Sequence, residues 1–157
     1  MENFNVLKCV KDLDAGNLDS LINYCDLILK GDSKNGKAYL FKARAYKDLG
    51  EYSKANFILS VGLDQCMNPN DRLDLLTEQI ETYGCMQNYK SALEVCIHAL
   101  TIVPEEIDLL FTQAILYYHN AKFNKALENL KKIKIFDTNE LYKEEINELN
   151  DKILEWL

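Results

Sequence analysis

Apolar residues recur along this chain in blocks that are separated by short polar turns. Four turns begin at Gly16, Gly50, Gln87 and Ala121, which lie 34, 37 and 34 positions apart. After each turn, apolar or small residues return at offsets of three and four, the spacing of one helix face. In chain order these columns are Leu18, Tyr52, Tyr89 and Phe123; Leu21, Ala55, Ala92 and Ala126; Cys25, Leu59, Cys96 and Leu130; and Ile28, Gly62, Ala99 and Ile133. The pattern predicts a helix after each turn.

A complementary stripe precedes the turns and predicts a partner helix before each of them. Its columns lie four, seven and eleven residues ahead of the turns and hold Tyr46, Tyr83 and Tyr117; Cys9, Ala43, Ile80 and Ala114; and Tyr39, Leu76 and Leu110. Large aromatic residues in one column and small residues in another predict interlocking helix pairs. Two helices and two turns fill about 34 residues, so the period indicates repeated helical hairpins.

These residues resemble the tetratricopeptide repeat family. The resemblance is clearest at Ala38, Tyr39, Gly50, Glu51, Tyr52 and Ala55, and again at Tyr83, Tyr89, Ala92, Ala99, Leu100 and Pro104. It implies an all-α fold, a right-handed superhelical stack of antiparallel helix hairpins (an α-solenoid). We expect a single domain over residues 1–157, with about four repeats at 2–35, 36–72, 73–106 and 107–140.

Two segments depart from the repeat. The second repeat is three residues longer, and we expect the extra length around residues 66–70, where Pro69 either ends one helix or starts the next. Residues 138–157 predict a single C-terminal capping helix, with Asp137 or Thr138 as its cap. Its apolar residues are Leu141, Tyr142, Ile146, Leu149, Ile153 and Trp156. The alternative is a helix for self-association or docking, because the last two residues, Trp156 and Leu157, are apolar.

Composition and charge narrow the class of partner. The chain has 157 residues, 48% of them apolar, and a net charge of −7. An acidic chain is a poor candidate for nucleic acid, whose phosphates bind clustered lysine and arginine. No apolar run reaches the ~20 residues that span a membrane, and the N-terminus lacks a signal-peptide pattern. We therefore expect no nucleic-acid or membrane partner, and a cytosolic or nuclear location by default.

Catalytic and metal chemistry find little support. The five cysteines include no CxxC pair, so we expect neither a disulfide framework nor a zinc site, and most of these thiols should be buried. Nothing in the sequence brings His98 or His119 to a nucleophile, and no phosphate loop or metalloprotease motif occurs. We predict a protein that is not an enzyme and has no metal or cofactor.

The family resemblance implies that the first helices of successive hairpins line a concave groove. Helical spacing then places a basic patch on the second hairpin, an acidic patch on the third and an apolar end on the fourth. The candidate partner-binding residues are Lys37, Leu40, Phe41, Arg44, Lys47, Glu78, Glu81, Phe111, Ile115 and Tyr118. A peptide or helical segment of mixed charge with an apolar anchor would fit such a groove. The alternative is that these charges are merely solvated and the apolar residues pack against neighbouring hairpins.

Co-chaperones of this family hold the carboxylate tail of heat-shock chaperones with a set of lysine, asparagine and arginine residues. In two registers the matching positions hold Val6, Val10, Phe41, Asp74 and Glu78, or Leu40, Arg44, Glu78, Asp108 and Thr112. Because acidic residues would repel a carboxylate, we expect no such clamp.

The leading hypothesis is thus a non-catalytic adaptor or scaffold that binds a protein segment in the groove. One alternative is assembly through the C-terminal helix, for which Leu149, Ile153 and Trp156 are the candidates and a homo-oligomer would result. Another is a holdase-type chaperone module, which would use apolar surface at Val6, Val10 and Ile115.

Overall fold

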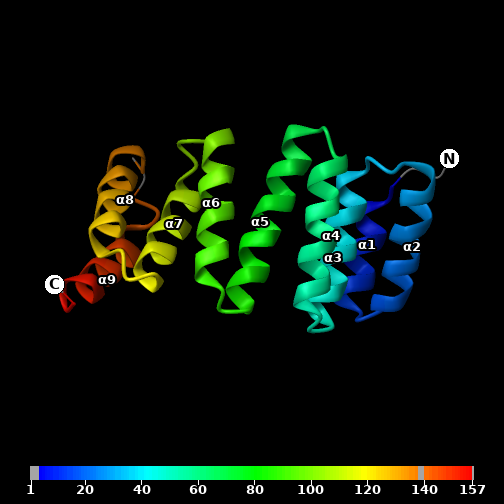
Figure 1. The fold of residues 1–157 in the computed structure, drawn as a ribbon, viewed down its shortest axis with the longest axis horizontal. Coiled ribbons are helices and arrows are strands. Elements are labelled where there is room, and N and C mark those ends of the chain that lie inside the picture. Colours follow the sequence, from blue (N-terminus) through cyan, green and yellow to red (C-terminus); the bar gives the residue numbers. More distant parts are fainter. Residues whose placement is uncertain (1–3, 138–139, 157) are drawn as a thin grey trace. The chain divides into compact units, whose positions relative to one another are not determined.

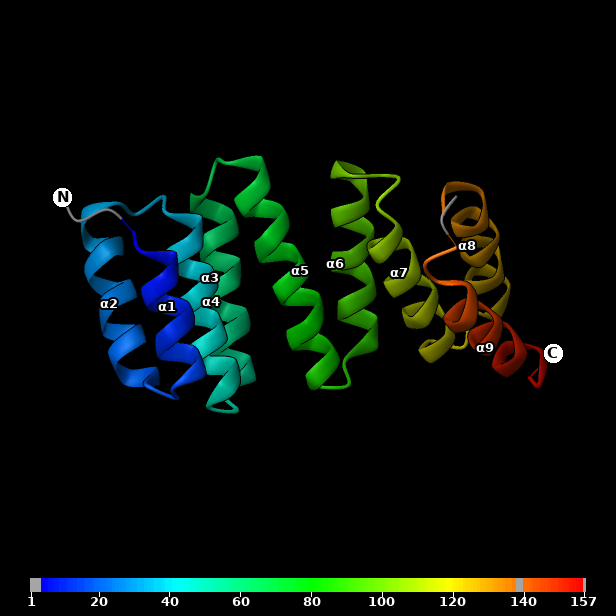
Figure 2. The same cartoon turned by 180° about the vertical axis from the view of Figure 1, so that it is seen from behind.

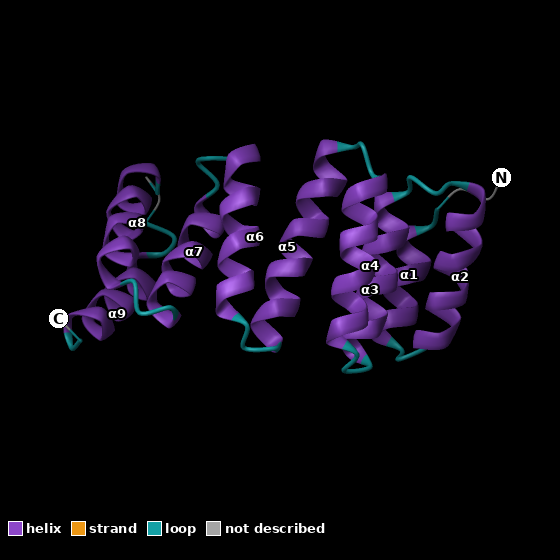
Figure 3. Cartoon of the chain, viewed as in Figure 1, coloured by secondary structure: helices purple, strands orange, loops and turns teal. Residues whose placement is uncertain are grey.

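The computed structural model describes residues 4–137 and 140–156, and within these ranges it contains nine α-helices and no strand (Figures 1 and 3). The chain divides into two compact units, Met1–Gln87 and Asn88–Leu157. In the first unit, short turns join successive helices at alternating ends (Figure 2).

The first unit contains α1 (Val6–Asp14), α2 (Leu18–Gly31), α3 (Gly36–Asp48), α4 (Tyr52–Gln65) and α5 (Pro69–Cys85). Helices α1 and α2 form one antiparallel hairpin, and α3 and α4 form the next. The third helix packs on both α2 and α5, and α4 also packs on α5.

The second unit contains α6 (Tyr89–Ile102), α7 (Ile107–His119), α8 (Phe123–Phe136) and α9 (Lys143–Leu154). Helices α7 and α8 form its hairpin, with α6 packed on α7 and α9 packed on α8.

Asparagine side chains start four of the nine helices. Asn5, Asn35, Asn68 and Asn88 each accept a hydrogen bond from a backbone N–H two or three residues ahead. These bonds satisfy donors that a helix leaves free in its first turn. Before α9, the Asp137 carboxylate accepts from the N–H groups of Leu141 and Tyr142 at 3.0 and 2.9 Å, so Asp137 organises the turn that leads into this helix. The other candidate cap, Thr138, lies outside the described residues.

The four turns from which the repeat was identified share one backbone conformation. Gly16, Gly50, Gln87 and Ala121 all have positive φ, between 54° and 76°. After α1, α3 and α7 the next residue donates to a carbonyl five positions back, as Glu51 does to Tyr46 at 2.9 Å. This is the Schellman ending of a helix, which favours glycine at the residue of positive φ. The repeat therefore marks a backbone requirement as well as a hydrophobic one.

Five of the seven predicted core columns are buried, and the columns that begin with Leu18 and Tyr46 are half-buried. Every residue in the second, third and fourth columns of the second helices, from Leu21 to Ile133, is buried. Helices α3 and α4 approach closely at Gly62, where an added Cβ would lie 2.8 Å from the Tyr39 Cβ. Four of the five thiols, those of Cys9, Cys25, Cys66 and Cys96, are fully buried, and only Cys85 is exposed.

Pro69 starts a helix rather than ending one. It occupies the first turn of α5, where its missing N–H costs nothing. Helix α5 has 17 residues, whereas α3 and α7 have 13, so the extra length of the second repeat lies in the first turn of this helix. The boundary expected after residue 72 falls inside α5.

Candidate protein-binding surfaces

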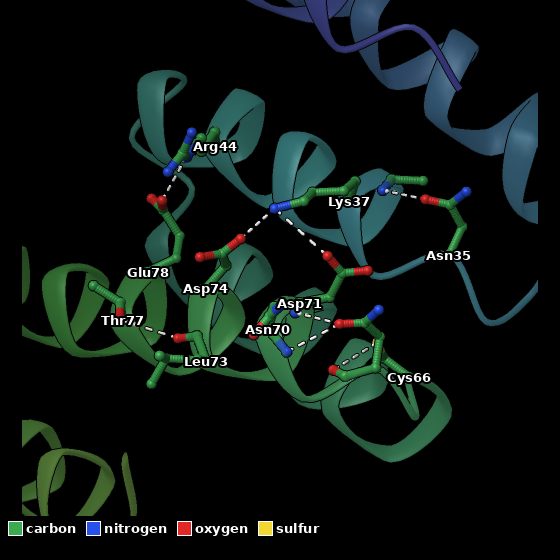
Figure 4. A network of polar contacts seen from close by, with 12 residues as sticks. Asn35, Lys37, Arg44, Cys66, Asn70, Asp71, Leu73, Asp74, Thr77 and Glu78 are labelled. Atoms are coloured by element: carbon green, nitrogen blue, oxygen red, sulfur yellow. Dashed lines mark hydrogen bonds and ion pairs between the residues drawn. The ribbon is translucent and has the colours of Figure 1, made fainter. Parts of the chain in front are cut away.

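In the first unit, three basic side chains of α3 pair with acidic side chains of α5, and Figure 4 shows the pairs of Lys37 and Arg44. Lys37 forms ion pairs with Asp74 and, at 3.5 Å, with Asp71. The Arg44 Nε lies 2.5 Å from the Glu78 Oε2. Lys47 pairs with the other oxygen of Glu78 and, at 3.1 Å, with Glu81. We call this set of pairs the α3–α5 ion-pair ladder.

Glu78 is the centre of the ladder: it pairs with both Arg44 and Lys47, and its side chain is only 2% exposed. A buried carboxylate needs a compensating charge, and both Arg44 and Lys47 supply it. Burial acts to lower the pKa of the Lys47 ammonium, but its hydrogen bonds and charge interactions with Glu78 and Glu81 outweigh burial and raise that pKa. The hydrogen bond to Asp74 likewise raises the pKa of Lys37.

In the first unit, the ladder and the core take up side chains that were predicted to line the groove. The basic patch and the acidic patch face each other and neutralise one another inside the chain. Leu40 and Phe41 were expected to face a partner, but they are only 4% and 3% exposed. Leu40 belongs to the core between α3, α4 and α5, whereas Phe41 packs toward α1 and α2 and contacts the ring of Phe4. Neighbouring helices cover both side chains, as the alternative interpretation expected.

In the second unit, three predicted residues line an open groove. Phe111, Ile115 and Tyr118 of α7 are half-buried, and they border a depression of about 380 Å³. His119 and four residues of α9 complete its lining: Glu145, Glu148, Leu149 and Lys152. We call this depression the α7–α9 groove.

Helix α9 stands where the first helix of a further hairpin would be. Its start is joined to α7 by a hydrogen bond from the Tyr142 hydroxyl to the Asp108 carboxylate, which are 34 positions apart, one repeat length. The Tyr142 ring also packs on Phe111, with ring centroids 5.2 Å apart. The hydrogen bond to Asp108, with burial and nearby acidic charge, raises the pKa of Tyr142 to about 12.

The apolar face of α9 is used within the chain. Ile146, Leu149 and Ile153 are buried against α7 and α8, as expected of a capping helix. Of the residues suggested for self-association, only Trp156 is exposed, and its ring stacks on Phe123 at 6.4 Å. Leu157 lies outside the described residues.

The apolar surface suggested for a holdase lies partly open. On α1, Val6 and Val10 are 46% and 39% exposed, and Leu7 beside them is 63% exposed. Ile115 belongs instead to the α7–α9 groove.

In the part of the chain that the structure describes, no three His, Cys, Asp or Glu residues are placed to hold a metal ion. His119 stacks on Tyr89 with ring centroids 4.2 Å apart, and His98 is exposed on α6. Burial raises the pKa of the Cys25 and Cys96 thiols to about 12, which keeps them protonated and unreactive.

Across the residues that the structure describes, no helix has the length and apolar character needed to cross a membrane.

The α9 wall of the groove was missed in the sequence. Glu145 and Lys152 stand 34 positions after Phe111 and Tyr118, so extending the repeat by one helix would have found them. Because both side chains are charged, the sequence suggested only that they form the solvent-exposed face of a capping helix.

Comparison with known proteins identifies the fold but no family. No protein-family model matches the chain, and no curated protein matches it. Solved structures of MamA are similar. A MamA fragment from Desulfovibrio magneticus RS-1 is 16% identical, with a TM-score of 0.69 over 94% of this chain and 89% of that one. A second MamA structure is 16% identical, with a TM-score of 0.70 over 98% and 95% of the two chains. A MamA point mutant is 17% identical, with a TM-score of 0.72 over 95% and 79%. The predicted fold class, an all-α solenoid of helix hairpins, is thereby confirmed.

Proposed function

We propose that this protein is a non-catalytic adaptor or scaffold that binds a segment of another protein on the exposed face of its first helices. The α7–α9 groove is the observation that carries the proposal. It keeps Phe111, Ile115 and Tyr118 half-open to solvent, whereas Leu40 of α3, at the repeat position of Phe111, is buried. Half-buried aromatic and aliphatic side chains in a groove are the usual anchors of peptide recognition.

The ion-pair ladder defines the role that Arg44 takes in this proposal. Its side chain is 40% exposed while its guanidinium is bound to Glu78, so it can meet a partner carboxylate only by sharing or exchanging that pair. We therefore assign the main binding energy to the α7–α9 groove and a smaller, charge-steering contribution to Arg44.

Site-specific photo-crosslinking tests the proposal on the full chain. A photo-reactive amino acid at position 119, which lines the groove, should capture a discrete partner from native extract. The same group at position 98, on the exposed face of α6, should not. Substitution of Arg44 and Phe111 together should weaken the captured interaction by about 1–3 kcal/mol, once thermal unfolding has shown that the variant is folded. Unchanged binding by that variant would remove the groove assignment.

Assembly with copies of itself is a second candidate function, and exposed Leu154 and Trp156 favour it. Sedimentation over a wide concentration range tests it. A mass that rises with concentration in the native chain, but not after Trp156→Ala, would support assembly, and a strict monomer would exclude it.

A further inference from the structure

The α7–α9 groove has two unlike walls. Helix α7 supplies Phe111, Ile115 and Tyr118, and α9 supplies Leu149 on the floor with Glu145 and Glu148 on the rim. Leu149 is 8% exposed and is held by the core, whereas both glutamates are exposed. The floor is therefore rigid and apolar, and the rim is acidic.

Acidic character continues beyond the groove. A neighbouring depression, next to the contact between Phe111 and Tyr142, is lined by Glu105, Glu106, Ile107, Asp108, Leu141 and Tyr142. Among the described residues that line the two depressions, Lys152 is the only lysine or arginine, and it is paired with Glu148 at 2.6 Å. The hydrogen bond to Asp108 and burial are the main causes of the raised pKa of Tyr142, and the charges of Asp108 and Glu145 add to them.

Aromatic faces beside carboxylates favour one class of ligand group. A lysine or arginine side chain gains from the π-face of a tyrosine or phenylalanine and from ion pairs with glutamate. An acidic segment would meet repulsion from Glu145 together with the loss of its hydration. The apolar floor adds a requirement for an anchor such as leucine or phenylalanine beside the cation.

We propose that the α7–α9 groove binds a protein segment that carries a lysine or arginine next to an apolar anchor, and that Glu145 of α9 selects this charge, since Glu148 already pairs with Lys152. Helix α9 is then a wall of the binding site as well as the cap of the fold. This inference rests on the proposed function, because it specifies the partner chemistry of the same groove.

Three synthetic peptides of about ten residues test the specificity by NMR titration of the full chain. The first carries a leucine flanked by arginines, the second has glutamates in place of the arginines, and the third has serine in place of the leucine. The first should shift the amide signals of Phe111, Ile115 and Leu149, and the other two should bind at least about tenfold more weakly. Raising salt from about 0.05 to 0.5 M should weaken the first peptide, because its ion pairs are exposed.

A matched pair of charge reversals locates the selection on the groove rim. Glu145→Lys and Asp151→Lys change the net charge equally, and both positions are exposed on α9, but Asp151 does not line the groove. The first substitution should weaken the arginine peptide by at least about fivefold, and the second by less than about twofold.

The outcomes separate the two proposals. Equal or tighter binding of the glutamate peptide in the groove, or equal effects of the two reversals, would overturn the charge selection and leave the groove as a protein-binding site. A crosslinked natural partner whose bound segment lacks a basic residue would do the same. Failure of position 119 to capture any partner would instead count against the proposed function itself.

Discussion

At the residue scale, the most informative positions are those where a small side chain is required by a neighbour. Gly62 lies inside α4, where glycine is normally unfavourable, yet the Tyr39 side chain fills the space that a Cβ would occupy. Gly84 lies in the last turn of α5 and has open space around its Cβ direction. The two glycines therefore look alike in the sequence and differ in the fold.

Substitution of these two glycines by alanine should have opposite effects. Gly62→Ala should lower the free energy of unfolding by about 1–3 kcal/mol, because overpacking against Tyr39 exceeds the gain in helix propensity. Gly84→Ala should raise it by roughly 0.5–1 kcal/mol through propensity alone. Urea unfolding measures both, and stabilisation by Gly62→Ala would contradict the close approach of α3 and α4.

The turn residue of positive φ allows a second test. Ala121 adopts φ 54° at the position where Gly50 adopts φ 76°. Ala121→Gly should stabilise the protein by about 0.5–1 kcal/mol, because the left-handed conformation costs alanine more than the extra chain entropy costs glycine. Gly50→Ala should destabilise it by a similar amount. Thermal unfolding of the two variants should shift in opposite directions, and a shift of the same sign in both would refute a shared backbone requirement.

At the element scale, the ion-pair ladder joins α3 to α5. Asp74 follows Lys37 by 37 positions and Glu81 follows Lys47 by 34, so the repeat period brings charges of opposite sign together on neighbouring first helices. The pairs differ in burial: Glu78 is 2% exposed, whereas Asp74 is 44% exposed. The ladder therefore contains two pairs at the buried Glu78 and three more exposed pairs.

Neutralising Glu78 should cost more than neutralising Asp74. Glu78→Gln keeps the shape of the side chain but leaves Arg44 and Lys47 without their buried counter-charge, so it should destabilise the protein by about 1–3 kcal/mol. Asp74→Asn should cost less than about 1 kcal/mol, because exposed pairs contribute little. Equal effects in urea unfolding at moderate salt would show that Glu78 is not the centre of the ladder.

At the scale of the whole molecule, each compact unit contains a deeply buried thiol, Cys25 in the first and Cys96 in the second. Burial raises the pKa of each to about 12 from an ordinary value of 9.0. Between about pH 9 and pH 12 the folded thiol therefore keeps its proton, whereas the thiol of the unfolded chain releases it. The stabilisation is complete below about pH 9 and is lost as the pH rises toward 12.

Stability should consequently fall at alkaline pH, by roughly 1 kcal/mol per buried thiol by pH 10. The raised pKa values of Lys37 and Lys47 add a further loss at higher pH, when their ion pairs are discharged. Urea unfolding under reducing conditions between pH 7.5 and about 10.5 measures the slope. A variant with Cys25→Ala and Cys96→Ala should lose stability less steeply, and parallel curves would exclude the thiols as the cause.

The helical hairpins and most of the core could be predicted because both follow from local rules. The period of 34 placed Leu21, Leu59, Cys96 and Ile133 on buried helix faces, and all four are buried. The same period marked the turns of positive φ, since a helix ending of this kind needs a particular residue within a few positions. Amphipathic spacing and turn chemistry act over one or two helical turns, so the sequence alone carries them.

The candidate site depended on contacts that spacing does not reveal. Spacing placed Phe41 and Arg44 on the exposed side of a first helix, but packing buried the first and paired the second with Glu78. From spacing alone, α9 was interpreted as a capping helix, whereas its position beside α7 makes Glu145 and Leu149 part of a groove. The sequence thus determined the fold class, the period and the core, because these depend on residues close in the chain. Only the tertiary structure decided which side chains remain open to a partner, because exposure depends on which helices come to lie beside each other.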